Sequence, residues 1–403
     1  MMADLSRPKI LRVVERLITG TGTSTLGNSW LAGKAAASAA MDELEGAEPS
    51  LVLVYASVRY ELSQLLAGIR AVTGSAALAG ATSCGHFAGD TVVEPGQGVS
   101  VLLLGGSDYG FGVASASGMR VDPEAVGRSV ARKGRTAAER EQSEPRPYAA
   151  MILFTDGLGG DQQAVLTGAH RVCGASVPIV GGAAADDRLL RQTSVFHDGA
   201  VLTDSAVGIW ISSSRPLTVT SAHGWKPVSL PLLITRADGS VIHEIGGRPA
   251  HDVYWELART LDARPAVPGG PTWQTSYALG LIEPDGSHLV RGVFASTDGS
   301  ISAFTPLPAY SAVQLMTADP GTLLAVVDGV IDETLIYGDE SVVLAFDCIA
   351  RMDILGDAYI EEISRMTKAA GDALCFGAYT YGEFARAKGV GGVHNATLTT
   401  LAL

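Results

Sequence analysis

The feature that most constrains this chain is a pattern of strand, helix and further strands that occurs three times. Each copy begins with an apolar run of strand length, continues with a helical segment and closes with two more apolar runs. The first runs lie at residues 51–57, 150–155 and 341–347, the helical segments at 60–72, 161–172 and 357–370, and the later runs at 77–81, 177–181, 373–378, 99–104, 206–211 and 395–401. This recurrence predicts an α/β fold with mixed sheets, built from three related β-α-β-β units in two closely packed domains.

The turn after the second run of each copy carries a sharper signal. It reads GATSCGHF at 80–87, GAAADDRL at 182–189 and GAYTYGEF at 377–384. A glycine at a strand end allows a positive φ or a close backbone approach. Ligands of α/β sheets bind outside the carboxyl ends of the strands. We therefore expect a pocket where segments 80–87, 181–188 and 377–384 converge, with simple tight turns as the alternative.

Composition limits the kind of partner. The chain has 403 residues, 47% hydrophobic and 18% charged, with a net charge of −13. This composition predicts a folded protein of two packed units, and the negative charge disfavours binding to nucleic acid or to anionic membranes. The N-terminus lacks the apolar core of a signal peptide, and no apolar run reaches 18 residues. Four cysteines stand far apart without a C-x-x-C pair, which is typical of reduced thiols in the cytoplasm.

Three local features lie between or beside the repeats. The Asp238-Gly239 dipeptide predicts a hairpin turn, and Pro249 predicts the first turn of a helix. The Pro/Gly-rich stretch 264–271 predicts a loop. The charged stretch 135–147 predicts a mobile excursion.

Several motifs in order resemble the FIST family. They are DGLGGD (156–161), PIVGGAAADD (178–187), HDG (197–199), AHGWKPV (222–228), TRADGSVIHEIGGRPAHDVY (235–254) and YTYGEF with HNATL (379–398). The likeness implies an N-terminal domain at 28–248, with repeats at about 50–105 and 150–212. It also implies a C-terminal domain at 249–403, with the third repeat at about 341–403.

The resemblance implies a sensory function. FIST proteins are regarded as intracellular ligand-sensing modules that accompany kinase, cyclase or chemotaxis output domains. We expect a stand-alone sensor without an output domain, which binds a small polar metabolite such as an amino acid. It would signal to a separate protein such as a histidine kinase or cyclase, with oligomer formation left open. The family pattern near the first repeat resembles G-C-S-T-A-G-E-I, so His86 replaces an acidic residue and Cys84 a small one.

Candidate ligand-binding residues follow from chemistry and position. Cys84 and His86, at i and i+2 on an extended segment, point to one face, where a thiolate–imidazole pair suits a soft metal, haem iron or nucleophilic attack. A buried thiol beside a hydrogen-bonded histidine is the alternative. The predicted ligand-binding residues are Ser83, Cys84, His86, Asp186, Asp187, His223, Trp225, Arg351, Tyr379, Tyr381 and Glu383.

The remaining candidates each have a structural alternative. Asp186 and Asp187 suit an ammonium group or a hard cation, or else they fix a turn. Trp225 suits a pocket wall or the core. Arg351 suits a ligand carboxylate, or else it pairs with Asp347 or Asp353.

Two other function classes remain open. A haem-binding sensor of nitric oxide would use His86, His223 or His394 as axial ligand, since some proteins resembling this family bind haem. A hydrolase would use Cys84 or Ser83, although a strand, not the required helix, is expected after Ser83. We favour no enzymatic activity, predict no metal site outside the haem alternative, and assign no other cofactor.

Overall fold

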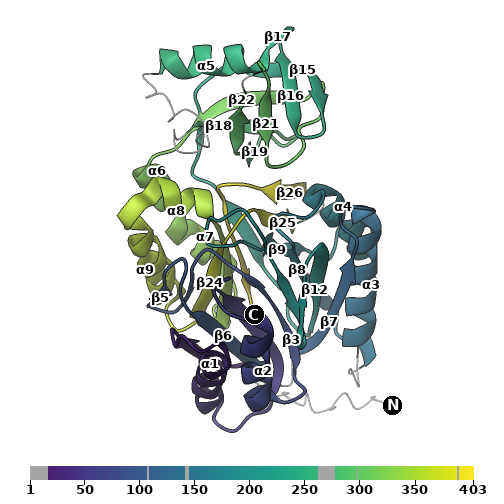
Figure 1. The fold of residues 1–403 in the computed structure, drawn as a ribbon, viewed down its shortest axis with the longest axis vertical. Helices are drawn as coiled ribbons and strands as arrows, with labels where there is room; N and C mark the ends of the chain where they lie inside the picture. The colour runs from purple at the N-terminus through teal and green to yellow at the C-terminus, as the bar shows by residue number, and fades with distance from the viewer. Residues whose placement is uncertain (1–16, 107–108, 141–144, 262–276, 297, 388–389) are drawn as a thin grey trace, which may run out of the picture.

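A computed structural model describes residues 17–106, 109–140, 145–261, 277–296, 298–387 and 390–403. Within these residues the fold is mixed α/β with four sheets. Figure 1 shows a large lower body that contains three of the sheets and a smaller upper module that contains the fourth.

The lower body is made of three blocks with a common order of elements. The first block comprises β1 (Ile18–Ser24), α1 (Ser29–Glu43), β2 (Pro49–Ala56), α2 (Leu62–Thr73), β3 (Ala77–Thr82), β4 (His86–Ala88), β5 (Thr91–Val93) and β6 (Val99–Gly105). The second comprises β7 (Tyr109–Ser117), α3 (Pro123–Arg140), β8 (Tyr148–Thr155), α4 (Gln162–Cys173), β9 (Ile179–Ala183), β10 (Val195–His197), β11 (Ala200–Leu202) and β12 (Ser205–Ser213). The third comprises β13 (Val219–Ala222), α6 (Pro320–Leu324), α7 (Val327–Thr334), β23 (Val342–Cys348), α8 (Ile349–Leu355), the 3-10 helix η2 (Gly356–Ala358), α9 (Tyr359–Ala370), β24 (Leu374–Thr380), β25 (Glu383–Ala387), β26 (Val390–His394) and β27 (Leu398–Ala402).

The predicted strands and helices of each copy are present, but each block begins earlier than the sequence indicated. The periodicity identified the segment from β2 to β6 and its two counterparts, whereas each block also has a preceding strand and helix. These additions are β1 with α1, β7 with α3, and β13 with α7. Each added strand lies at the outer edge of its sheet, against the last strand of its own block.

The blocks exchange hairpins in a ring. Each of the three sheets in the lower body contains four strands of its own block and a two-stranded hairpin from another block. The hairpin β10–β11 joins the first sheet, β25–β26 joins the second and β4–β5 joins the third. Every block therefore gives one hairpin and receives one.

Alternation along the strands builds the cores. In β2, Leu53 and Tyr55 face a central core shared by all three sheets, whereas Val52 and Val54 face helices α1 and α2. At the centre, Tyr55 stacks on Phe376 with ring centroids 5.3 Å apart and meets Phe154 edge-on at 6.0 Å. The inner faces of the sheets therefore share one dry core, while helices cover the outer faces (Figure 1).

The upper module is inserted in the third block between β13 and α6. It comprises β14 (Lys226–Pro227), β15 (Leu232–Asp238), β16 (Val241–Ile245), β17 (Arg248–Pro249), α5 (Ala250–Thr260), β18 (Tyr277–Ile282), β19 (His288–Arg291), β20 (Val293–Ala295), β21 (Ile301–Ala303) and β22 (Ala312–Thr317). The hairpin predicted at Asp238-Gly239 is confirmed as β15–β16, and Pro249 is the N-cap of α5. The module has its own apolar core and stands over the strand ends of the body (Figure 1).

Two loop predictions have different outcomes. The mobile excursion predicted at 135–147 was wrong for its first part, because α3 continues to Arg140. Ala138 is buried on the inner face of this helix, and Arg135 forms an ion pair with Glu139 one turn further along. The charged residues of this stretch therefore lie on the solvent-exposed face of an amphipathic helix. The loop predicted at 264–271 lies outside the described residues.

Candidate functional site

The three turn segments converge, as predicted, and they bond directly to one another. The backbone N–H of Cys84 donates to Tyr379 O at 2.9 Å, and that of Ala185 donates to Thr82 O at 2.9 Å. The N–H of Tyr381 completes the set by donating to Ala183 O at 3.0 Å. Their meeting point is packed, and the hollows of interest lie just beyond it, beneath the upper module.

Ser83, Cys84 and His86 belong to this packed interior. All three are at most 1% exposed, and Ser83 Oγ lies 3.0 Å from His86 Nδ1. Burial raises the pKa of Cys84 to about 12 and lowers the pKa of His86 to about 3, so both groups are neutral near pH 7. The structure thus corresponds to the alternative of a buried thiol near a hydrogen-bonded histidine, and it places His86 away from the cavities described below.

The two aspartates hold the loop that follows β9. Asp186 accepts hydrogen bonds from the backbone N–H groups of residues 190–192 and from the Tyr381 hydroxyl. Asp187, whose φ of 53° is left-handed, accepts from the N–H of Gly96 at 2.6 Å. Their carboxylates already have donors, so the geometry favours turn-fixing over contact with a ligand.

Arg351 is the centre of a buried polar cluster. Its guanidinium lies 3.1 Å from Asp347 Oδ1 and also pairs with Glu362, and the side chains of all three are fully buried. It donates to His223 O at 3.0 Å and to Leu323 O at 3.1 Å. A ligand carboxylate would have to displace these partners, so we assign Arg351 to positioning the segments that carry His223 and Leu323.

Tyr379 and Glu383 complete this interior. The Tyr379 hydroxyl donates to Glu362 Oε2 at 3.3 Å. Glu383 accepts from Thr380 Oγ1 at 3.0 Å and from the N–H of Thr397 at 3.3 Å, and burial holds its pKa well above the usual range. Thr380 and Glu383 occupy the positions of Ser83 and His86 in the first block. In both blocks, therefore, a hydrogen bond between the side chains of residues i and i+3 closes this turn.

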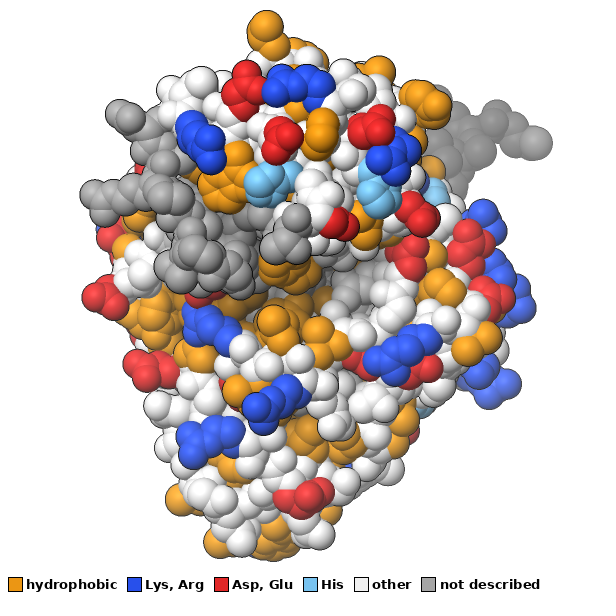
Figure 2. All heavy atoms as spheres, turned by 45° about the horizontal axis from the view of Figure 1, so that its top comes forward, with side chains coloured by type: hydrophobic (Ala, Val, Ile, Leu, Met, Phe, Trp, Pro, Cys, Tyr) orange, Lys and Arg blue, Asp and Glu red, His pale blue; other side chains and the backbone are white. Residues whose placement is uncertain are grey.

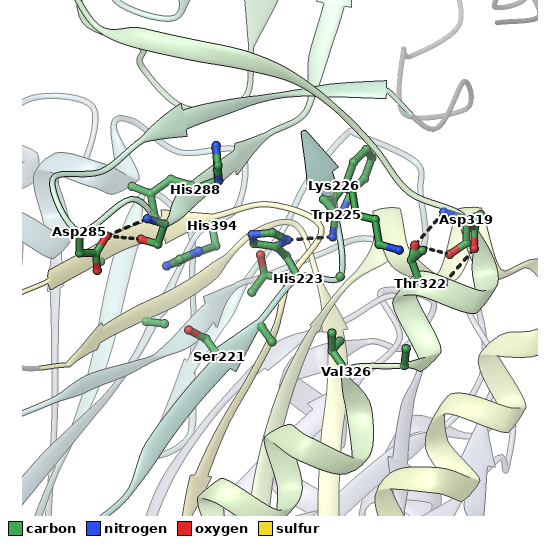
Figure 3. A pocket seen from close by; sticks show the side chains of 18 of the residues that line it. Ser221, His223, Trp225, Lys226, Asp285, His288, Asp319, Thr322, Val326 and His394 are labelled. Atoms are coloured by element: carbon green, nitrogen blue, oxygen red, sulfur yellow. Dashed lines mark hydrogen bonds between the residues drawn. The ribbon is translucent and has the colours of Figure 1, made fainter. Parts of the chain in front are cut away.

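A cavity of about 880 Å³ lies between the body and the upper module, and we call it the histidine cavity. Figure 3 shows its wall, with His288 and His394 toward one end, Asp319 and Thr322 toward the other, and His223 between them. The side chains come from β13 and the segment after it, from β19, from α6 and from the end of β26. It is therefore built from both tiers of the molecule.

His223 presents a hydrogen-bond donor to this cavity. Its Nδ1 accepts a hydrogen bond from the N–H of Trp225 at 2.9 Å. Burial, together with His288 and Arg351, lowers the pKa of His223 to about 4, so the ring is neutral near pH 7. A neutral imidazole that accepts at Nδ1 carries its proton on Nε2. The cavity therefore has a fixed N–H donor at this position.

His394 offers two further hydrogen-bonding atoms. The residue is 7% exposed, its two ring nitrogens are shielded in the cavity wall, and neither forms a hydrogen bond of good geometry with a described residue. The backbone of Ala385 lies close enough to raise the pKa of the ring slightly. Burial, with smaller contributions that include Arg291, lowers the pKa of His394 to about 3. A buried polar group without a partner costs about 1–3 kcal/mol, which a bound molecule would recover.

Charged side chains of both signs line the same cavity. Lys226 is exposed beside Trp225, and Asp285 lies at the opposite end near His288 (Figure 3). Hydrogen bonds from Ser287 lower the pKa of Asp285, which is consequently anionic at neutral pH. A second carboxylate, that of Asp319, lies at the same end as Lys226 and accepts a hydrogen bond from the N–H of Thr322 at the start of α6. Lys226 and Asp285, at separate ends, suit a zwitterionic molecule.

The cavity joins some of the predicted residues and adds others. His223, Trp225 and His394 were singled out from the sequence, whereas Lys226, Asp285 and His288 were not. The Asp285-Gly286 turn before His288 is a visible hairpin signal, but nothing local shows that this hairpin faces β13 across a cavity. Figure 2 shows the molecule hollowed between the two tiers, with hydrophobic side chains gathered in the hollow.

The described residues lack two kinds of feature. They contain no group of three or more His, Cys, Asp or Glu side chains placed to hold a metal ion. Their helices are all too short or too polar to cross a membrane.

Comparison with known proteins gives matches over most of the chain. Residues 50–248 match the FIST N domain and residues 250–386 match the FIST C domain, which confirms the resemblance drawn from the motifs. An uncharacterized protein of Mycobacterium tuberculosis (strain CDC 1551 / Oshkosh) is 28% identical over 312 residues, which cover 74% of this chain and 76% of that protein. An uncharacterized protein of Methanocaldococcus jannaschii is 25% identical over 214 residues, 52% of this chain and 40% of its own.

One solved structure overlaps nearly the whole chain at low similarity. It is a cyanuric acid hydrolase, described as an evolutionary innovation by structural concatenation. It covers 96% of this chain and 99% of its own, with 9% sequence identity and a TM-score of 0.35. At that score the overlap supports no argument about this chain.

Proposed function

Because the chain belongs to the FIST family, we propose that it is a sensor that binds a small, polar, carboxylate-bearing metabolite, such as an amino acid, in the histidine cavity. The observation that carries the proposal is His394, a buried imidazole in the cavity wall whose ring nitrogens meet the geometric criteria for a hydrogen bond with none of the described residues and interact only with the backbone of Ala385 among them. Protein interiors satisfy nearly all buried polar groups, and an exception facing a cavity points to a bound molecule.

Recognition would use groups of opposite sign. The Nε2–H of His223 and the ammonium of Lys226 supply donors for a carboxylate. The carboxylate of Asp285 supplies an acceptor for an ammonium group at the other end. The neutral His394 can donate through one nitrogen and accept through the other.

Ligand binding would bias how the two tiers sit together. The cavity wall joins β13 and β26 of the body to β19 of the upper module. A ligand that contacts both tiers stabilises the arrangement in which they are close, and a partner can read that shift in population. We propose that the chain acts in the cytoplasm and that the partner is a separate signalling protein such as a histidine kinase or cyclase.

Isothermal titration calorimetry with the twenty amino acids and short dicarboxylates tests this proposal. At least one of them should bind saturably, and Lys226→Met should weaken that binding by about tenfold or more, the size expected for one lost charge-assisted hydrogen bond. Lys34→Met is the matched control, since Lys34 lies on α1 over the Trp30 ring, and it should leave binding unchanged. If the folded protein bound none of these compounds at millimolar concentration, the proposal would be refuted.

Haem is the second candidate, since a neutral imidazole in a cavity wall also suits an axial ligand. Of the three predicted ligands, only His223 and His394 line the cavity, and His86 does not fit because Ser83 holds its Nδ1 in the packed interior. A visible spectrum of the protein as purified from cells distinguishes the two. A Soret band that is present in the wild type and lost in His394→Phe would show that the ligand is haem and not a metabolite. We propose no enzymatic activity, because Ser83 and Cys84 are buried.

A further inference from the structure

A second cavity, of about 580 Å³, lies on the other side of Trp225, and we call it the aromatic cavity. We infer that it is a separate binding site for an uncharged, planar molecule of one or two rings that carries a single N–H or O–H donor. The inference rests on the shape and chemistry of this cavity and does not depend on the ligand proposed for the histidine cavity.

The walls are apolar and largely aromatic. Phe294 and Phe304 of the upper module meet edge-on with ring centroids 4.4 Å apart, and both line the cavity. Trp225 lines it as well, and because its Nε1 donates to Ala396 O at 3.2 Å, the indole offers its ring to a ligand. Flat aromatic molecules pack well against such rings, by stacking or edge-on contact.

One polar atom in this lining lacks a partner. Asn395 is 4% exposed, and its Oδ1 has no hydrogen-bond partner among the described residues. The other polar side chains are engaged: the Tyr381 hydroxyl donates to Asp186, and Arg188 pairs with Asp353 at 2.6 Å. This Oδ1 is itself shielded in the wall, so a rotation of the Asn395 side chain is needed to turn it toward a ligand. A ligand with one N–H or O–H would then satisfy Asn395 and need no further polar contact.

The cavity also disfavours a charged ligand. Its one cysteine, Cys348, is 3% exposed, and burial above all, with the nearby Glu383, holds the pKa of that thiol well above its usual value. The wall around Asn395 is therefore neutral. An ion entering it would lose its water without gaining an unpaired countercharge, in contrast to the histidine cavity with its lysine and aspartate.

Indole and benzofuran are the probes, because they have nearly the same size and shape and only indole has an N–H donor. Titration calorimetry with the full chain should show one saturable indole site, and benzofuran should bind at least tenfold more weakly. Ala350→Phe, on α8 at the cavity wall, should weaken indole binding at least tenfold, because the added ring takes up part of the cavity beside the aromatic wall. Ala325→Phe, which faces the histidine cavity instead, is the matched control and should leave indole binding unchanged.

A second variant keeps the test decisive if Ala350→Phe fails to fold by circular dichroism. Asn395→Leu should reduce the affinity for indole to that for benzofuran and leave the affinity for benzofuran unchanged. The inference is overturned if indole does not saturate the wild type, if benzofuran binds as tightly as indole, or if Ala325→Phe alone removes binding. Amino acid titrations of the same variants report on the histidine cavity, so failure of one site is distinguishable from failure of the other.

Discussion

Replacing Arg351 by methionine should destabilise the protein by about 3–5 kcal/mol, the cost of removing one partner from a buried ion pair. The guanidinium is the cation that faces Asp347 and Glu362, and the side chains of all three are fully buried. Methionine preserves most of the side-chain volume, so the loss comes from the uncompensated carboxylates and not from a cavity. The variant also removes the donors to His223 O and Leu323 O.

The pH dependence gives the prediction a second signature. Burial, followed by repulsion from Glu362, raises the pKa of Asp347, and Arg351 lowers it in part. Removing Arg351 should raise that folded-state pKa further above the unfolded value. A group with a raised folded pKa contributes stability below its unfolded pKa and loses it as the pH rises through the folded pKa. The deficit of the variant relative to wild type should therefore be smaller at pH 5 than at pH 8.

Urea unfolding followed by circular dichroism measures both effects, provided that the slope m is unchanged between proteins. The control is Arg365→Met on α9, which removes an exposed i,i+4 pair with Glu361 and should cost about 0.5 kcal/mol or less. An Arg351→Met protein whose midpoint moved no further than that of Arg365→Met would contradict the reasoning. So would a deficit that grew as the pH fell.

Three further predictions concern packing, titration and thiol reactivity. Gly80→Ala should destabilise the protein by about 1–3 kcal/mol in urea unfolding, because a Cβ there would lie 2.0 Å from Val54 O, whereas Gly27→Ala, with open space around it, should cost far less. Because burial raises the pKa of Glu383, wild type should lose stability as the pH rises through that pKa, and the stability of Glu383→Gln relative to wild type should increase with pH in the same assay. Because all four cysteines are buried, iodoacetamide at pH 8 should label none of them before unfolding and all of them after it, and native labelling would contradict the packing described.

The hydrophobic pattern of the sequence predicted the repeated strands and helices, because the pattern of a strand or helix depends only on residues that are close together in the sequence. It did not predict the hairpin exchange, since His86 pairs with Ala378, which lies 292 residues further along the chain (378 − 86). It also misaligned the second turn segment by one residue: the alignment matched Gly182 to Gly80, but Gly181 opposes Leu153 as Gly80 opposes Val54. A one-residue shift changes which side chains face the core, and only the strand pairing fixes it.

The residues of the site were likewise predicted only where the signal lies in neighbouring residues of the sequence. His223 and Trp225 were found because an imidazole and an indole two residues apart after a strand are unusual in themselves. Asp186 carried an equally strong chemical signal, but its partners are backbone N–H groups that no sequence pattern identifies. His288 lies in an inserted module whose position over the body depends on the packing of the whole chain.

The ring of exchanged hairpins also governs how the molecule can be made. During synthesis the hairpin β4–β5 emerges long before the strand β24 that it joins, since His86 pairs with Ala378, 292 residues later (378 − 86). The strand β9 of the second sheet likewise waits for β25, since Gly182 pairs with Glu383. Such distant pairings slow folding and leave strand edges open in the meantime. The three blocks therefore cannot mature one after another as independent units, and the body reaches its final form only after the third block has been synthesised.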